Sequence, residues 1–198
     1  SLSSVDLSAL SSVTSIGSSF LENCESLTSV DLKNLTSVTN IKSGFLQNCK
    51  SLTSVNLSGF ASLTSIGDEF LWGFHSLTNV NLNSFSSVKS IGVSFLRNCS
   101  SLTSIDLSGL SSVKSIGSSF LTDCDSLTNI NLGNCVTAGK INDRDKHSFA
   151  IYNDHEPKNA PAWVKGITLT GADKDNITSK FPYRGGKQRD KYWRKWPN

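Results

Sequence analysis

The amino-acid sequence predicts a solenoid built from short parallel strands and tight turns. A motif of 25 residues recurs in register and without insertions through five near-copies that span residues 1–125. A sixth copy begins at Ser126 and loses the pattern after about residue 141. A fixed period of this length is typical of a solenoid, in which each unit buries its apolar edge against its neighbours. We therefore predict one coil for each repeat.

The first element expected in each coil is a short strand. In the second copy, Val30 and Leu32 flank a polar residue, and every other copy has apolar residues at the same two positions. This alternation predicts a strand with one side chain inward and the next outward. Aligned copies form apolar ladders at eight positions, which in the second copy are Leu27, Val30, Leu32, Leu35, Val38, Ile41, Phe45 and Leu46.

A second extended stretch and a turn are expected further along each coil. In the first copy the stretch is Val13–Ile16, and the β-branched residues at its ends favour extended backbone. Glycine follows it in four copies, which suits a turn with positive φ, and Lys42 breaks that pattern in the second copy. We expect Ser18–Cys24 to form one helical or 3₁₀ turn that points Phe20 inward. The four glycines are Gly17, Gly67, Gly92 and Gly117.

The repeat resembles the BspA-like class of leucine-rich repeats. The residues that carry the resemblance are Cys24-x-x-Leu27-x-x-Val30-x-Leu32, then Val38-x-x-Ile41, then Phe45-x-x-x-Cys49. Two features depart from the class: the period is longer, and Ser, Gly or Lys-containing turns replace the Pro after the strand. The resemblance covers residues 1 to about 141. It implies a leucine-rich-repeat solenoid of a kind that is typically surface-exposed or secreted, and often adhesive.

The end of the chain breaks the period. We predict leucine-rich repeats over residues 1–141, with five full copies and a partial sixth, and an irregular C-terminal capping region over residues 142–198. Within the cap, Val164, Ile167 and Leu169 restore the spacing of the first strand, with Leu169 in the role of Leu132. We therefore expect a seventh strand near residues 163–170. Terminal repeats must seal the open hydrophobic edge and are usually irregular.

Charge divides along the chain at about the same point. Residues 1–133 carry 6 Lys or Arg against 9 Asp or Glu, a net −3, whereas residues 134–198 carry 13 against 7, a net +6. Basic residues interleaved with aromatic ones can bind nucleic acid or an anionic surface. The alternative is that the aromatics cap the solenoid and the bases keep the terminus soluble. The candidate tail residues are Arg184, Lys187, Arg189, Lys191, Trp193, Arg194, Lys195 and Trp196.

One polar position of the first strand is Asp or Asn in every copy. The resemblance implies that this face lines the concave side, where leucine-rich repeats commonly bind ligands. The face lacks the aromatic and Arg anchors that usually dominate interface energy. Its alternative role is a solvated face whose side chains hydrogen-bond along the ladder. The candidate binding residues are Asp6, Asp31, Asn56, Asn81, Asp106 and Asn131.

The cysteines form a fourfold ladder with Phe74 at the missing rung. Since Phe replaces Cys only in an apolar socket, we interpret the ladder as buried thiols that pack as small hydrophobic groups. Inter-coil disulfides and metal binding are the alternatives, although no metal-ligand motif accompanies the ladder. The ladder is Cys24, Cys49, Cys99 and Cys124, and Cys135 lies off it.

No residue pattern indicates catalysis, so we predict a protein that is not an enzyme, has no cofactor and binds no metal. The glycosylation sequons at Asn34, Asn56, Asn98 and Asn176 occur about as often as this composition gives by chance, and they do not establish secretion. No apolar run approaches the length of a membrane span. Because Ser1 begins in phase without a cap or signal peptide, we expect either a cut fragment or further units before it.

We therefore predict a non-catalytic interaction module with a protein or glycan ligand, extracellular or at a cell surface, and adhesive. Two alternatives stay open. One is an ice-binding solenoid that uses a regular threonine row. The other is a cytoplasmic or organellar scaffold subunit that uses the basic tail, within a nucleoprotein complex. The threonine row consists of Thr28, Thr53, Thr78, Thr103 and Thr128.

Overall fold

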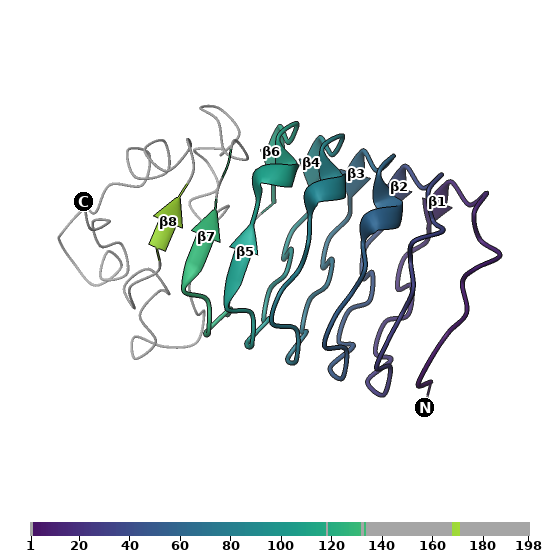
Figure 1. Cartoon of the computed structure of the whole chain (residues 1–198), viewed down its shortest axis with the longest axis horizontal. Helices are drawn as coiled ribbons and strands as arrows, with labels where there is room; N and C mark the ends of the chain where they lie inside the picture. Colours follow the sequence, from purple (N-terminus) through teal and green to yellow (C-terminus); the bar gives the residue numbers. More distant parts are fainter. Residues whose placement is uncertain (1, 118, 132, 134–167, 171–198) are drawn as a thin grey trace.

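The predicted solenoid is confirmed. The computed structural model describes residues 2–117, 119–131 and 133, and the backbone of residues 168–170. Successive 25-residue coils stack side by side along one axis, with the N-terminal coil at one end of the stack (Figure 1). Each coil hydrogen-bonds to the next through residues one period apart, such as the Thr39 N–H, which donates to the Thr14 carbonyl at 2.9 Å.

Two parallel sheets run along the stack. The longer sheet uses the second extended stretch of each coil, as predicted, and it pairs the same isoleucine position from coil to coil. Its strands are β1 (Ser15–Ile16), β2 (Asn40–Ile41), β3 (Ser65–Ile66), β4 (Ser90–Ile91) and β6 (Ser115–Ile116). The shorter sheet consists of β5 (Ser104–Asp106), β7 (Asn129–Asn131) and β8 (Thr168–Thr170).

The shorter sheet follows the first predicted strand in only part of the array. The fifth and sixth coils supply β5 and β7, whereas in the earlier coils this stretch forms only an isolated bridge between Asp31 and Asn56. The strand β8 pairs with β7 and lies inside the range predicted for a seventh strand. Its register differs from the expected one, because Leu169 lies opposite Ile130 rather than Leu132. The rest of the predicted cap lies outside the described residues, and the domain boundaries stay a prediction.

Stacked aromatic rings form the centre of the core. The rings of Phe45, Phe70, Phe95 and Phe120 lie nearly parallel, with centroids 5.1 to 5.4 Å apart, and all four side chains are fully buried. Phe20 in the first coil continues the stack at 5.7 Å but is only half-buried, since no described coil covers its outer side. Burial of apolar area on both faces of each inner coil is the main force that holds the stack together.

The glycines after the second strand serve a different purpose from the one expected. None of the four has positive φ. A Cβ on Gly67 would instead lie 2.6 Å from the Lys42 carbonyl carbon and 2.7 Å from the Ser43 nitrogen of the preceding coil. Gly92 and Gly117 approach the coils before them equally closely. At Gly67, Gly92 and Gly117, glycine is therefore needed because the backbones of neighbouring coils almost touch.

The segment after each of these positions is not the helical or 3₁₀ turn expected at Ser18–Cys24. In the first coil, Ser19, Leu21 and Asn23 have φ near +60°, and a right-handed helix cannot accommodate positive φ at every second residue. Some N–H groups of the segment donate to a carbonyl three residues back, as Glu22 does to Ser19 at 3.2 Å, and others bond to a neighbouring coil. The Leu46 N–H, for example, donates to the Phe20 carbonyl at 2.9 Å. The residues at the third of these positions tolerate positive φ: Asn23, Asn48, Gly73, Asn98 and Asp123.

The 3₁₀ turns lie elsewhere in the coil, directly after the first strand. They are η1 (Ser58–Phe60), η2 (Asn83–Phe85) and η3 (Ser108–Leu110). Each one ends on a buried apolar side chain, so it carries the chain from the polar strand face into the core. In the third to fifth coils, the first residue of each 3₁₀ turn donates its N–H to the Asp or Asn side chain of the strand face.

Candidate functional site

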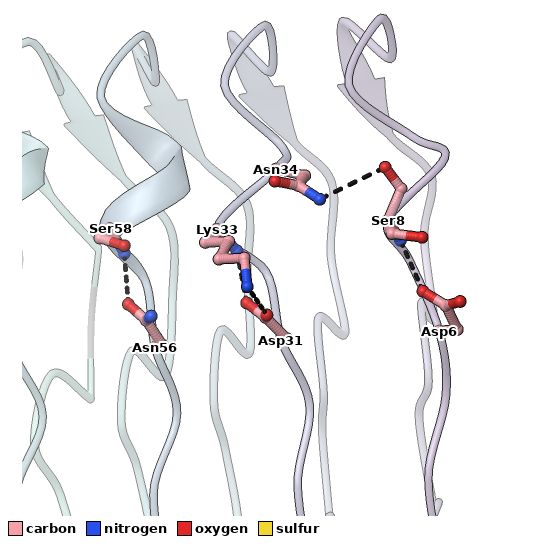
Figure 2. A network of polar contacts seen from close by, with 7 residues as sticks. All are labelled: Asp6, Ser8, Asp31, Lys33, Asn34, Asn56 and Ser58. Atoms are coloured by element: carbon pink, nitrogen blue, oxygen red, sulfur yellow. Dashed lines mark hydrogen bonds and ion pairs between the residues drawn. The ribbon is translucent and has the colours of Figure 1, made fainter.

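The six Asp and Asn residues of the strand face all make the same local hydrogen bond. In each case the side-chain Oδ1 accepts the backbone N–H two residues later, at 2.8 to 3.1 Å. Figure 2 shows this bond in the first three coils. Such Asx turns satisfy a backbone donor where the chain leaves the strand. We call the set the Asx row: Asp6, Asp31, Asn56, Asn81, Asp106 and Asn131.

The Asx turn explains why Asp and Asn interchange along the row. Both side chains supply the Oδ1 acceptor, so the turn needs no charge. Hydrogen bonding to Ser8 lowers the pKa of the Asp6 carboxyl. Hydrogen bonding to Ser108 likewise lowers the pKa of Asp106, although partial burial opposes the shift. One oxygen of each residue therefore serves the fold, and only the second oxygen or the amide nitrogen remains for other partners.

In the second coil, the Asx-row residue Asp31 also forms an ion pair with Lys33. The Lys33 Nζ lies 2.8 Å from the Asp31 Oδ2, while the Lys33 N–H bonds to the other oxygen. Hydrogen bonding between the two side chains lowers the pKa of Asp31 and raises that of Lys33. Both side chains are exposed, so solvent screening leaves the pair little effect on stability. Asp31 thus has neither carboxylate oxygen free.

A groove of about 420 Å³ opens on the strand face across the fourth to sixth coils. Its polar lining is rich in carboxamides and carries one carboxylate, from Asp106. Carboxamides offer both donors and acceptors without net charge. The groove therefore presents mainly neutral hydrogen-bonding groups, together with the Asp106 carboxylate, beside the backbone of β5 and β7. Its side-chain polar groups come from Asn79, Asn81, Asn83, Ser104, Asp106, Asn129 and Asn131.

Several of these groups are fixed by contacts along the stack. The Asn131 Nδ2 donates to the Asp106 Oδ1 at 3.1 Å, and the Asn129 Nδ2 donates to the Thr128 hydroxyl at 3.2 Å. Within the described part of the chain, the second carboxylate oxygen of Asp106 and the Asn129 Oδ1 accept no hydrogen bond, and both residues line the groove. Asn79 and Asn83 are exposed. These fixed acceptors and adaptable amides could hold a polar, uncharged ligand.

Only half of the candidate binding residues of the Asx row line the groove. Asn81, Asp106 and Asn131 line it, whereas the other half of the Asx row lies in the first three coils, outside it. Sequence reasoning did not select Asn83, which follows the strand rather than lying in it. A usable signal was the change from Ser in the early copies to Asn at position 79 and again at position 129. That the Asx row binds a ligand stays a prediction.

The described cysteines fit the packing interpretation. Cys24, Cys49, Cys99 and Cys124 are free thiols, and the last three are buried. Each buried thiol donates to a leucine carbonyl of the preceding coil; the Cys49 Sγ lies 3.1 Å from the Leu21 oxygen. Burial raises the pKa of Cys49 to about 12 and that of Cys124 well above its usual range. Such thiols are poor nucleophiles.

Other predicted sites have no structural description. The candidate tail residues from Arg184 to Trp196 lie outside the described residues, as does Cys135. Across the described part of the chain, His, Cys, Asp and Glu side chains form no group of three that could hold a metal ion. In the same part, no helix is long and apolar enough to cross a membrane.

Comparison with known proteins places the repeat in a family. The sequence profile described as "BspA type Leucine rich repeat region" matches six copies over residues 14–145. A solved leucine-rich repeat protein from T. pallidum is similar to the chain, with 25% sequence identity and a TM-score of 0.50; the match covers 62% of this chain and 59% of that one. A leucine-rich repeat protein from Bacteroides ovatus matches with 16% identity and a TM-score of 0.22, over 65% of this chain and 54% of that one.

The matched region spans less than two thirds of each of these two solved proteins. No curated protein matches the chain. The similarity to the T. pallidum protein therefore supports the solenoid fold, and leaves activity and partners to be argued from the residues of this chain.

Proposed function

Because the chain belongs to the BspA-type leucine-rich repeat family, we propose that it is a non-catalytic interaction module that adheres to a macromolecular ligand outside the cell or at its surface. Leucine-rich repeats typically serve as protein-interaction domains. A solenoid suits this role, because stacking gives an extended and regular surface whose side chains vary without loss of the core. The surface location and the adhesive role are parts of the proposal.

The observation that carries the proposal is the carboxamide groove over the fourth to sixth coils. At this position the first three coils present serine, whereas two of the three groove coils present Asn79 and Asn129 and the coil between them keeps Ser104. The core beneath repeats from coil to coil, so packing does not demand this change. Longer amide side chains gather where the face is hollowed, and this favours ligand contact as their role.

The chemistry of the groove favours a neutral polar ligand. Carboxamides pair well with peptide groups and with sugar hydroxyls, since each of these offers a donor and an acceptor. A strongly charged ligand would find one carboxylate and no Lys or Arg in the lining. We therefore propose an uncharged stretch of peptide or glycan as the contacted part of the partner.

The proposal is tested by screening the purified chain on arrays of glycans and of extracellular-matrix proteins. For whichever ligand binds, the double variant Asn79→Ala/Asn129→Ala should weaken binding by roughly 5- to 150-fold, given about 0.5–1.5 kcal/mol for each of two lost hydrogen bonds. Ser4→Ala/Ser29→Ala, at the same positions outside the groove, is the matched control and should bind normally. Equal affinity of the two variants would exclude the groove, and absence of any ligand on both arrays would count against the adhesive role.

A second candidate function is ice binding through the threonine row. All five threonines are exposed and spaced one coil apart. At Thr28, Thr103 and Thr128 the hydroxyl donates to a carbonyl of the preceding coil, which leaves it as an acceptor only. Absence of thermal hysteresis at high protein concentration would remove this candidate. A cytoplasmic scaffold role rests on the basic tail and is tested by salt-dependent RNA binding with and without residues 184–198.

A further inference from the structure

We propose that Asn56 is an acceptor site for an N-linked glycan, and that the other sequons of the described chain are not. Three sequons lie within the described residues, at Asn34, Asn56 and Asn98. The sequence treats them as equivalent, because each has Ser or Thr two residues later. Their surroundings in the fold differ, and the difference selects one of them.

The Asn56 side chain is exposed and its amide nitrogen is free. Its Oδ1 accepts the Ser58 N–H at 3.1 Å, and within the described part of the chain its Nδ2 has no hydrogen-bond partner. Figure 2 shows the amide held by that single bond, with the nitrogen on the side away from it. The attacking atom of the acceptor is thus presented to solvent.

The two other described acceptors use the same nitrogen to hold the stack together. The Asn34 Nδ2 donates to the Ser8 carbonyl of the preceding coil at 3.3 Å, and Asn34 is half-buried (Figure 2). The Asn98 Nδ2 lies 3.3 Å from the His75 Nε2, and Asn98 is half-buried in the tight loop with φ of 58°. A glycan on either nitrogen would remove an inter-coil contact and crowd the neighbouring coil.

The Asx turn at Asn56 joins the two residues that define the sequon. Its bond runs from the N–H of Ser58, the hydroxyl residue, to the carboxamide of the acceptor. Since this contact spans only two residues, it can form before the coils stack. The bond fixes the carboxamide plane and polarises its carbonyl. The sequon therefore reaches a transferase in a defined conformation, whether or not the chain has folded.

The reaction is a glycosyl transfer from a lipid-pyrophosphate-linked oligosaccharide, the co-substrate class that N-glycosylation uses. The Asn56 Nδ2 forms a bond to the anomeric carbon of the sugar, and the bond from that carbon to the phosphate oxygen breaks. The lipid pyrophosphate leaves with the electron pair, and the nitrogen loses one proton to a base of the transferase. No electron is gained or lost by either substrate.

A glycan at Asn56 is compatible with the groove described above. Asn56 lies in the third coil and is not among the residues that line the groove. The neighbouring residue of the row, Asn81, makes the same Asx turn with the Asn83 N–H at 2.9 Å. Asn81 lacks only a hydroxyl residue two positions later. It therefore provides a test of the turn geometry within the same row.

The experiment directs the full chain through the secretory pathway of a eukaryotic host and maps glycans by mass spectrometry, with and without peptide-N-glycosidase. Among the three described sequons we expect a glycan only at Asn56. It should be lost in Asn56→Gln and in Ser58→Ala, whereas Asn34→Gln and Asn98→Gln should leave it in place. Ser58→Ala keeps the backbone N–H and hence the turn, so circular dichroism should show it folded. Asn83→Ser creates a sequon at Asn81 in the same turn and should add a second glycan.

Three results would overturn the proposal. An unmodified Asn56 in secreted protein would show that the exposed turn is not an acceptor. Glycans at Asn34 or Asn98 in amounts similar to Asn56 would show that the sequon alone decides and that the fold has no influence. Failure of Asn83→Ser to add a glycan, with Asn56 modified, would contradict the role assigned to the turn.

Discussion

Replacing Gly67 by Ala probes the closeness of neighbouring coils. The added Cβ would lie 2.6 Å from the Lys42 carbonyl carbon and 2.7 Å from the Ser43 nitrogen, both backbone atoms. Carbon atoms in contact normally lie about 3.5–4.0 Å apart, so the coils must separate by roughly an ångström or the strand must shift. Overpacking of this kind costs about 1–3 kcal/mol. The opposing gain from a stiffer unfolded chain is about 0.4–1 kcal/mol.

The matched control is Gly17→Ala. Gly17 holds the same position in the first coil, but a Cβ added there would have no other atom within 4 Å. This variant should be as stable as the parent chain or more stable by up to about 1 kcal/mol. Lys42 holds the same position in the second coil, and the coil before it contacts a described coil on one side only. The inner coils are held on both sides.

The assay is equilibrium unfolding in urea, followed by circular dichroism at one temperature and pH. We expect the midpoint to fall for Gly67→Ala and to stay or rise for Gly17→Ala. If the two variants shift the midpoint equally, or if Gly67→Ala is the more stable, glycine is not required by the close approach. The expectation of a turn with positive φ predicts the opposite for Gly17→Ala, which would then be destabilised along with Gly67→Ala.

Three further predictions follow from the core, the Asx row and the thiols. Phe70→Ala should lower the free energy of unfolding, measured in urea, by about 3–5 kcal/mol, and clearly more than Phe20→Ala does. Phe70 is fully buried between two stacked rings, whereas Phe20 is half-buried against one. Equal losses in the two variants would contradict the role given to the ring stack. Hydrogen bonding to Ser108 lowers the pKa of the Asp106 carboxyl from its ordinary value of 3.8. The ionised carboxylate therefore stabilises the fold above pH 3.8, and this stabilisation is lost as the pH falls through the lower folded-state pKa. Asp106→Asn keeps the Oδ1 acceptor and should make unfolding less sensitive to acid, whereas an unchanged dependence of stability on pH would refute the role given to Asp106. Burial raises the pKa of Cys49 to about 12, so this thiol should resist thiol reagents at pH 8 until the chain unfolds. Cys24, which is half-buried in the first coil, should react earlier. Peptide mapping of the labelled sites gives the order of reaction, and the reverse order would contradict the burial of Cys49.

The sequence predicted the parts of the fold that depend on repetition. Ladders such as Phe45, Phe70 and Phe95 can be read directly, because one side chain at one period must meet its own copy in the next coil. The fold class, the stacking and the second strand of each coil follow from that. The period does not specify whether a polar side chain contacts a neighbouring coil or solvent. The roles of the polar residues were therefore predicted less well than the core.

The misassigned positions have physical reasons. Glycine serves both positive φ and close backbone approach, and the sequence at Gly67 does not distinguish them, since the atoms that exclude a Cβ belong to another coil. Leucine rarely adopts positive φ, so nothing in the sequence indicates that Leu21 or Leu46 would do so. Inter-coil hydrogen bonds hold this backbone, which overrides local preference.

The candidate site was predicted only in outline. The regular Asp and Asn residues were recognised as a polar face, but their shared bond to the backbone depends on the turn that follows. The groove depends on the shape of the face across three coils, and no single repeat encodes that shape. The asparagines at positions 79 and 129 were visible in the sequence, whereas the hollow between them was not.

The most direct measurement of the central claim is a nuclear magnetic resonance titration of the isotope-labelled chain with the ligand found on the arrays. The account predicts shifts confined to the fourth to sixth coils, with the side-chain amides of Asn79, Asn83 and Asn129 moving most. The Asp6 and Asp31 turns should remain unchanged, because both residues lie outside the groove. Shifts spread evenly along the whole Asx row, or concentrated in the first three coils, would contradict the claim.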